Sequence, residues 1–327
     1  MKRRRFIGLF GGAAVAWPLA TAAQQASKPV VAFLRVGSPD TSARYVAAFR
    51  KGLVETGYTE NQNVTVEYHW FDHFDRAPAL VTDLVRRQVA VIVTPGFTQA
   101  AVAAKAATTS IPIVFGVPAD PVQLGLVASL SRPGGNATGV NFFATEIVGK
   151  RLRLLHDLVP KAVRIAAFLN PANPTTTAPT LRDLQEAAPA IGLQTQILNT
   201  TTIADKDAAF GGFERDRPDA LFVGPDSFFF ERRFQFVELT ARHKIPAIFA
   251  FRAFVEAGGL MSYGTDLTDM FRQVGVYTGR VLKGARPADL PVLQSTKFEF
   301  VLNLSTAKAL GIEVPSGVLS IVDEVID

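Results

Sequence analysis

The sequence contains no cysteine among its 327 residues. This absence excludes disulfides, zinc–thiolate sites, thiol nucleophiles and a lipid-modified cysteine. The sequence also lacks a G-x-S-x-G turn, a G-x-x-x-x-G-K-[ST] phosphate loop and a G-x-G-x-x-G motif after its first expected strand. The commonest enzyme signatures are therefore missing, although carboxylates from distant positions, such as Asp120 and Asp226, could still assemble a hydrolytic pair.

Histidine is scarce, with four residues in the chain. His69 and His73 are four residues apart, a spacing that pairs metal ligands on a helix. The pattern around them indicates a strand followed by a loop instead, so we expect no metal site and no cofactor.

Runs of Lys and Arg are absent beyond the N-terminus. Residues 1–22 hold four of the 34 Lys and Arg and none of the 29 Asp and Glu, so the remaining chain is almost neutral. It offers no basic track for a phosphate backbone, and we expect no nucleic-acid partner. No later apolar stretch approaches the ~20 residues that span a membrane.

The N-terminus has the form of an export signal. Residues 2–5 are basic, residues 6–19 are mostly apolar, and Ala20-Thr21-Ala22 has the form of a cleavage site. Residues 3–7 resemble the twin-arginine export signal, with the general route as the alternative. We expect residues 1–22 to be a signal peptide that is removed and the protein to be exported to the periplasm; an N-terminus that stays attached as an anchor is the other interpretation.

The two halves of the chain resemble each other. Four segments of the first half return in order in the second, at offsets between 124 and 135 residues: 32–35 as 167–170, 91–97 as 221–227, 111–115 as 245–249, and 133–135 as 257–259. Repeated segments in kept order indicate two similar lobes. A cleft between two lobes is a common place for a small ligand.

Short apolar runs alternate with amphipathic stretches, which predicts an α/β fold of two Rossmann-like lobes with parallel sheets covered on both faces. Residues 120–130 and 228–243 are each expected to form one helix. We expect lobe one to hold residues 28–141 plus about 264–290, and lobe two to hold residues 142–263 plus about 291–327. The chain would then cross between the lobes three times and form a hinge. Ligands of such sheets lie beyond the carboxyl ends of the strands.

Six segments in a fixed order span nearly all of the chain after the leader: FLRVGS (33–38), VRRQVAVIV (85–93), ADPVQLGLV (119–127), SRPGGNATGV (131–140), VEAGGL (255–260) and LKGARPADLP (282–291). They resemble the periplasmic substrate-binding proteins of ABC transporters, in particular the group that includes tryptophan- and aromatic-amino-acid-binding members. The resemblance implies the type I periplasmic-binding-protein fold, a small molecule in the interlobe cleft, delivery to an ABC membrane permease, and no enzymatic turnover. A monomer is the default expectation.

Three departures leave the ligand class open between an amino acid and a related carboxylate, aromatic or not. Gly96-Phe97 stands where the aromatic-amino-acid binders carry an Ala or Ser pair. Asp226-Ser227-Phe228 replaces Asp-Asn-Thr, and Arg252 offers a cation where an acidic residue often stands.

The candidate ligand-binding residues follow the ends of expected strands. Thr94, Gly96, Phe97 and Thr98 stand where the third strand passes into a helix, whose first backbone N–H groups could hold a carboxylate. Thr98 could instead only cap that helix. Asp226 occupies the matching place in the second half and could bind an ammonium group or cap the helix that follows.

Asp120, Asn170, Asn173, Phe228 and Tyr263 complete the set. The first three lie beside prolines and could equally serve turns. Phe228 begins a run of three aromatic residues that cannot share one helix face, so at least one could stack on a flat ligand. The other hypothesis is a periplasmic enzyme or ligand-sensing domain on the same scaffold, and turnover of a bound ligand would distinguish the enzyme.

Overall fold

The computed structural model describes residues 28–71, 76–142 and 147–327. The predicted signal peptide lies outside these residues, as does His73. Among the described residues, every helix is too short or too polar to cross a membrane.

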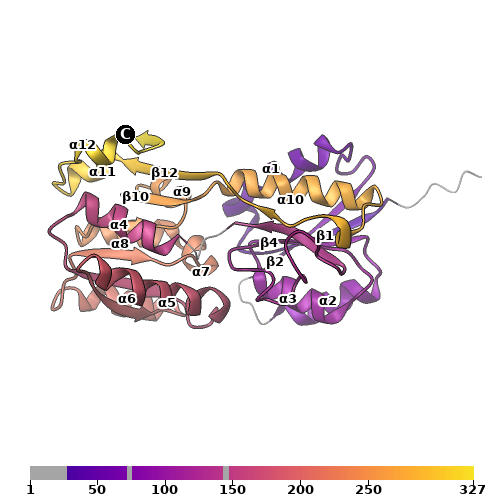
Figure 1. The fold of residues 1–327 in the computed structure, drawn as a ribbon, viewed down its shortest axis with the longest axis horizontal. Coiled ribbons are helices and arrows are strands. Elements are labelled where there is room, and N and C mark those ends of the chain that lie inside the picture. Colours follow the sequence, from indigo (N-terminus) through magenta and orange to yellow (C-terminus); the bar gives the residue numbers. More distant parts are fainter. Residues whose placement is uncertain (1–27, 72–75, 143–146) are drawn as a thin grey trace, which may run out of the picture.

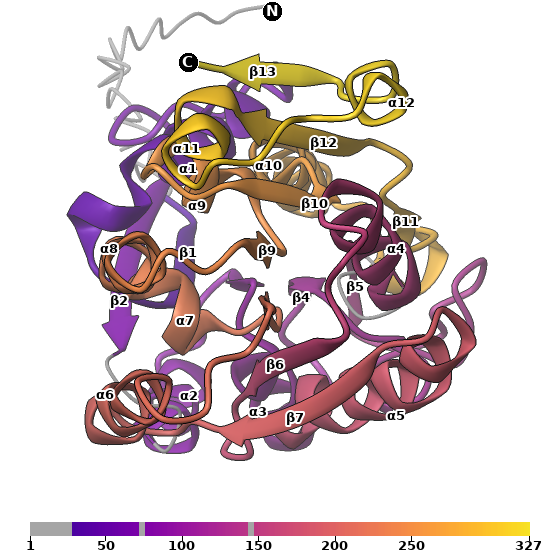
Figure 2. The same cartoon turned by 90° about the vertical axis from the view of Figure 1, so that its left-hand side faces the viewer.

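Two α/β lobes lie side by side, each built on one sheet (Figures 1 and 2). The strands of the first sheet are all parallel to their neighbours and run in the order β11 (Leu293–Gln294), β5 (Ala137–Asn141), β4 (Ile113–Val117), β3 (Val91–Pro95), β1 (Val30–Val36), β2 (Thr65–Phe71). The second sheet runs in the order β13 (Glu324–Ile326), β12 (Phe298–Asn303), β10 (Met261–Thr265), β9 (Ala247–Phe249), β8 (Ala220–Val223), β6 (Arg164–Leu169), β7 (Gln194–Asn199). The predicted α/β fold with two sheets is confirmed, with one exception to parallel pairing, since β10 and β12 are antiparallel.

Helices cover both faces of each sheet. In the first lobe, α1 (Pro39–Glu55) packs along α10 (Leu267–Leu282) on one face, and α2 (Ala77–Arg86) lies with α3 (Thr98–Ala107) on the other. In the second lobe, α4 (Val148–Leu158), α5 (Pro174–Ala190), α11 (Leu304–Ala309) and α12 (Ser316–Leu319) cover one face, and α6 (Ile203–Gly212), α7 (Ser227–Glu231), α8 (Arg233–Arg242) and α9 (Arg252–Glu256) the other. A short 3-10 turn, η2 (Pro287–Asp289), precedes β11.

The alternation of side chains along β1 explains how both faces are buried. Val31 and Phe33 join the apolar cluster under α1 and α10, whereas Ala32 and Leu34 join the cluster under α2 and α3. Successive residues of a strand point to opposite faces, so a strand covered on both sides needs apolar residues at nearly every position.

The chain passes between the two sheets three times: after β5, between β10 and α10, and between β11 and β12. The second and third passages are joined to each other, because Asp266 N donates to the Lys297 carbonyl and Lys297 Nζ lies 2.6 Å from Asp266 Oδ2. The first and second are also joined, since Thr265 Oγ1 donates to the carbonyl of Phe142. The three passages therefore form one hydrogen-bonded hinge.

The lobes are closed on each other. One apolar cluster runs from α1 and α10 of lobe one into α7 and α9 of lobe two. Within it, the rings of Tyr45 and Phe230 have centroids 5.8 Å apart, and those of Phe142 and Phe251 have centroids 6.5 Å apart. A cleft closed by apolar contact excludes water from whatever it encloses.

Two expected helices are wrong. Residues 120–130 form a series of turns, in which Gly125 adopts a left-handed backbone with φ 70°. The helix expected over 228–243 breaks at Arg232, whose φ of −104° and ψ of 20° end α7 and begin α8. The consecutive rings of Phe229 and Phe230, in α7 before the break, are both buried, at 0% and 4% exposure.

Candidate functional site

A cavity lies between the two lobes, beyond the carboxyl ends of β1, β3, β4 and β8. Its charged lining residues are one cation from lobe one, Arg35, and one anion from lobe two, Asp226. The rest of the lining combines small polar residues with a wall of apolar ones: Gly96, Thr98, Gln99, Asn173, Thr176 and Ser227, and Pro118, Phe142, Pro225, Phe230, Phe251, Leu267, Met270 and Phe271. The cavity therefore suits a small ligand with an aromatic or apolar body and polar ends.

Arg35 lies next to the end of β1 and extends the alternation that places Val31 and Phe33 toward α1 and α10. Its Nε donates to Ser42 Oγ at 3.0 Å, and its Nη1 donates to the Pro95 carbonyl at 3.3 Å. Burial lowers the pKa of Arg35 from its usual value, an effect that the nearby carboxylate of Glu231 opposes. The guanidinium is thus buried, and its hydrogen bonds to Ser42 and Pro95 hold it in place.

The guanidinium of Arg35 is also stacked among aromatic rings. Its central carbon lies 4.8 Å from the ring centroid of Phe271, 5.5 Å from that of Tyr45 and 5.7 Å from that of Phe230. Such cation–π contacts stabilise a desolvated cation.

Asp226 follows β8 and caps α7, where its Oδ1 accepts from Phe228 N at 2.8 Å. The same carboxylate accepts from Asn170 Nδ2 at 2.9 Å and from Asn173 Nδ2 at 2.7 Å. Burial raises the pKa of Asp226, against the lowering effect of these hydrogen bonds. Capping and ligand binding were alternatives in the sequence, and the structure makes Asp226 a cap that also lines the cavity.

Polar contacts join the two lobes around the cavity. Gln99 Nε2 donates to Asn173 Oδ1 at 2.7 Å, and Ser227 Oγ donates to the Gly96 carbonyl at 3.4 Å. Thr41 Oγ1 donates to Glu231 Oε2 at 2.6 Å. These contacts exist only while the lobes are together, so they stabilise the closed form.

Five of the predicted residues gather at the cavity. Gly96, Thr98, Asn173 and Asp226 line it, and Asn170 lies directly behind Asp226 through its hydrogen bond. Thr98 is the first residue of α3 and its side chain makes no cap, because the N-cap position belongs to Phe97. Residues that follow β3 and β8 therefore line this cavity from opposite lobes.

The other five predicted residues lie outside the cavity lining. Phe97 is fully buried on the far side of β3, edge-on to the ring of Phe71 at 5.1 Å. Thr94 is also fully buried, and its hydroxyl has no hydrogen-bond partner among the described residues. Their side chains lie away from the cleft: Phe97 belongs to the apolar cluster under α2 and α3, and Thr94 follows Ile92 on the same face of β3. A ligand contact at these two positions is left to the backbone.

Asp120, Phe228 and Tyr263 have structural partners instead. Asp120 Oδ1 accepts from Val122 N at 2.8 Å and lies in a separate surface hollow beside α5. The guanidinium of Arg232 covers the ring of Phe228 at 3.9 Å, and Tyr263 stacks on Phe298 with centroids 6.1 Å apart.

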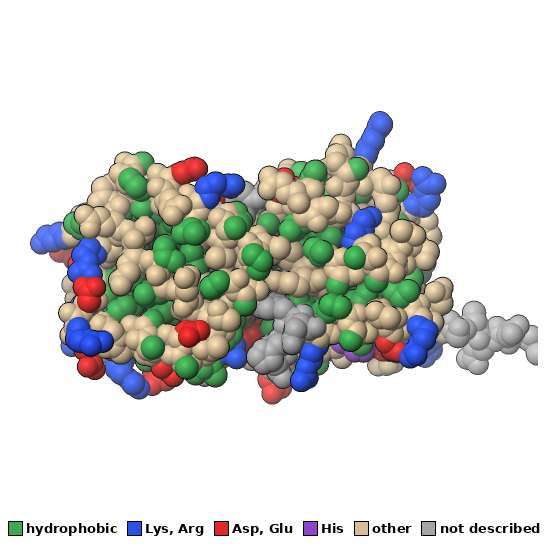
Figure 3. Space-filling view, turned by 90° about the horizontal axis from the view of Figure 1, so that it is seen from below, with side chains coloured by type: hydrophobic (Ala, Val, Ile, Leu, Met, Phe, Trp, Pro, Cys, Tyr) green, Lys and Arg blue, Asp and Glu red, His purple; other side chains and the backbone are tan. Residues whose placement is uncertain are grey.

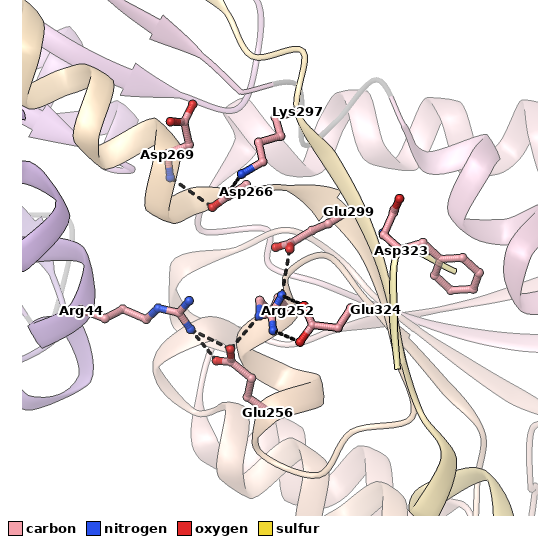
Figure 4. Close-up of polar contacts among 10 residues, drawn as sticks. Arg44, Arg252, Glu256, Asp266, Asp269, Lys297, Glu299, Asp323 and Glu324 are labelled. Carbon is pink, nitrogen blue, oxygen red and sulfur yellow. Dashed lines mark hydrogen bonds and ion pairs between the residues drawn. The ribbon is translucent and has the colours of Figure 1, made fainter. Parts of the chain in front are cut away.

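Arg252, the cation that the sequence offered to a ligand, is committed to three carboxylates (Figure 4). It contacts Glu299 at 3.1 Å and Glu256 at 2.7 Å, and it also pairs with Glu324. Glu256 in turn accepts two hydrogen bonds from Arg44 of lobe one, at 2.7 and 2.8 Å. Arg252 therefore belongs to a charged network beside the hinge.

One face of the described residues shows how the surface charges are distributed. On the face that carries α2, α3, α5 and α6, acidic and basic side chains lie near one another, with apolar side chains between them (Figure 3). Among the described residues there is also no group of three or more His, Asp or Glu that could hold a metal ion.

Sequence reasoning missed Arg35, Gln99 and the aromatic wall. Arg35 is a charged residue inside an otherwise apolar strand next to its carboxyl end, and that signal could have identified it. In the aromatic wall, Phe230 belongs to the run of three aromatic residues of which one was expected to face a ligand. Phe142, Phe251 and Phe271 have no comparable signal, since they come from separate segments that meet only when the lobes close.

Comparisons with known proteins agree with this geometry. Residues 30–326 match a family described as ABC transporter substrate binding protein. The chain is 26% identical over 268 residues to a tyrosine-binding protein of Clostridioides difficile (strain R20291), covering 81% of this chain and 76% of that one.

Two solved structures are similar over most of the chain. The ABC domain from Streptococcus pneumonia in complex with L-Trp superposes with a TM-score of 0.81 at 26% identity, covering 92% of this chain and all of that one (100%). A conserved domain protein from Vibrio cholerae gives a TM-score of 0.82 at 25% identity, covering 91% and 99%. The chain belongs to the ABC transporter substrate binding protein family and has the type I periplasmic-binding-protein fold.

Proposed function

We propose that this protein is a periplasmic solute receptor, which binds an amino acid or a related carboxylate, aromatic in character, between its lobes and delivers it unchanged to an ABC permease. The observation that supports this most directly is the composition of the cavity. Arg35 and Asp226 approach it from opposite lobes, and phenylalanine rings form the wall between them. A ligand that bridges the two lobes stabilises the closed form, because it contacts both only when they meet.

Each part of an amino acid has a complementary group in the cavity. The ammonium group lies beside Asp226, whose carboxylate is buried among amides. The carboxyl group lies at the start of α3, near Gly96 and Thr98, where the first backbone N–H groups have no partner within the helix. The side chain packs against the rings of Phe142 and Phe251.

The relatives support an aromatic ligand. The C. difficile protein is named for tyrosine, and the S. pneumonia structure holds L-Trp. The abundance of phenylalanine in this cavity agrees with such a ligand, because aromatic rings pack well edge-to-face or offset against one another. The partner of the closed receptor would be the membrane permease, and one copy of the chain holds both halves of the cavity.

Thermal unfolding with a ligand panel tests this function. Both sheets lie within residues 28–327, so protein without residues 1–22 keeps the whole fold. The panel would contain the amino acids, aromatic acids and small carboxylates. A ligand present at 100 times its Kd adds about 2.7 kcal/mol to the free energy of unfolding, which raises the midpoint by a few degrees.

We expect a saturable shift with tyrosine or tryptophan, and recovery of that ligand unchanged by chromatography. Chemical conversion of a bound ligand would support the enzyme alternative. The absence of a shift across the whole panel would contradict the receptor function proposed here.

A further inference from the structure

The two charged residues of the cavity differ in how their charges are compensated. Asp226 accepts hydrogen bonds from neutral groups, namely the side-chain amides of Asn170 and Asn173 and the backbone N–H groups of Phe228 and Phe229. These amides stabilise the carboxylate but do not neutralise it. A cation on the ligand would do so.

Arg35 already has a carboxylate beside it. Its Nη2 lies 3.9 Å from Glu231 Oε1, and the two side chains are only 8% and 12% exposed. Glu231 reaches it from α7 of lobe two, with its other oxygen held by Thr41 Oγ1 at 2.6 Å. Arg35 lines the cavity and Glu231 does not, so their contact lies outside the cavity lining.

Gly37, which has no side chain, leaves room for the Glu231 carboxylate. A Cβ atom on residue 37 would stand 2.4 Å from Glu231 Cδ and 2.5 Å from both of its carboxylate oxygens. The closed position of Glu231 therefore depends on Gly37. Closure of the lobes brings an anion to Arg35 whether or not the ligand carries one.

We infer that Glu231 is the counter-ion of Arg35 in the closed cleft and so determines the specificity of the receptor: the ligand must carry a cation on an aromatic body, and its carboxylate is dispensable. The start of α3 is compatible with this, because its uncharged N–H groups donate to a neutral oxygen as well as to a carboxylate. This inference rests on the proposed function and changes its ligand class: aromatic amines join the aromatic amino acids, and carboxylates without an amine are excluded.

Three probes that share one ring test the inference by isothermal titration calorimetry. L-Tyrosine carries both charged groups, tyramine lacks the carboxylate, and 3-(4-hydroxyphenyl)propionate lacks the ammonium. We expect tyramine to bind within about tenfold of tyrosine, and the propionate to bind about 100-fold more weakly or worse, since a lost charged partner leaves Asp226 buried without compensation.

A charge-removing variant assigns the effect to Glu231. Glu231→Gln keeps the side-chain shape and an acceptor for Thr41 but leaves Arg35 without a counter-ion. The affinity of tyrosine relative to tyramine should then rise by about tenfold or more, because a ligand carboxylate now takes that place. Glu256→Gln is the matched control, since Glu256 also joins the lobes, through Arg44, but pairs with Arg44 and Arg252 rather than with Arg35. In this variant the affinity of tyrosine relative to tyramine should stay at the wild-type value.

The results separate the inference from the function on which it rests. If the propionate binds and tyramine does not, the inference is overturned and the receptor function stands. The same follows if the affinity of tyrosine relative to tyramine is equal in Glu231→Gln and the wild type. Failure of all three probes and of the wider ligand panel overturns the receptor and the inference together. The ranking of the probes on wild-type protein decides the matter even where a variant fails to fold.

Discussion

Gly37→Ala tests whether the contact between the lobes at Glu231 controls closure. Gly37 has φ 112°, a conformation that side-chain-bearing residues rarely adopt, and a methyl group there would overlap the Glu231 carboxylate. Glu231 is flexible and can withdraw, but it then loses Thr41 Oγ1 and moves away from Arg35. The substitution thus strains the backbone of lobe one in every form of the protein, and it removes the Glu231 contacts only in the closed form.

The two effects have different sizes and different readouts. The left-handed backbone costs a non-glycine residue about 1–2 kcal/mol, in the open and closed forms alike, and lowers the free energy of unfolding. A hydrogen bond to a charged group contributes about 1.5–3 kcal/mol, and its loss destabilises the closed form alone. Since ligand binding requires closure, the second effect should weaken affinity by about 10–100-fold.

A double-mutant cycle with Glu231→Ala checks this assignment by calorimetry with tyrosine. In the Glu231→Ala background the added methyl meets no carboxylate, so Gly37→Ala should no longer change the affinity although it still lowers stability. Gly57→Ala is the control, since Gly57 has φ 86° but only Lys283 Nζ lies within 4 Å of its would-be Cβ, at 3.9 Å. It should lower stability without weakening binding. An equal loss of affinity from Gly37→Ala in both backgrounds would refute the reasoning.

Three further predictions concern the fold and the hinge. Burial acts to raise the pKa of Glu256, but hydrogen bonds from Arg44 and Arg252 outweigh it and hold that pKa below its usual value. The stabilisation by the ionised Glu256 is therefore present above its unfolded-state pKa and is lost as pH falls through its folded-state pKa. Between neutral and acid pH, Glu256→Gln should lose less free energy of unfolding, measured in urea, than the wild type. Phe168→Ala should cost about 3–5 kcal/mol in chemical denaturation, because the ring packs at 5.2 Å against two other buried rings. Gly264→Ala should destabilise by about 3 kcal/mol or more, measured in the same way, since its Cβ would stand 1.9 Å from a backbone carbonyl oxygen that has little freedom to move.

The sequence allowed the fold and the location of the site to be predicted because both follow from local patterns. Apolar runs of strand length alternating with amphipathic helices leave few arrangements other than parallel sheets covered on both sides. Parallel strands end at one edge, so residues after strand ends, such as Gly96 and Asp226, are brought to the same cleft.

The direction of individual side chains could not be predicted in the same way. Phe97 precedes a helix by one residue, and whether its ring enters the cleft or the core depends on how α3 lies against β3. Arg35 and Phe271 meet only because α10 returns to the first lobe after most of the second lobe. Contacts between segments more than 200 residues apart leave no periodic trace in either segment.

The return of the chain to lobe one also constrains how the protein folds. Strand β11 pairs with β5, with Leu293 opposite Val140, and α10 covers the sheet that β1 to β5 form. Until about residue 294 has left the ribosome, that sheet lacks its edge strand and one covering helix, and its apolar face stays exposed. Long sequence separation between partners slows folding because loop closure precedes the stabilising contacts. Cleavage of the chain at one site therefore cannot yield either lobe as a separate folding unit. We also expect the nascent chain to form its two sheets together, after synthesis rather than during it.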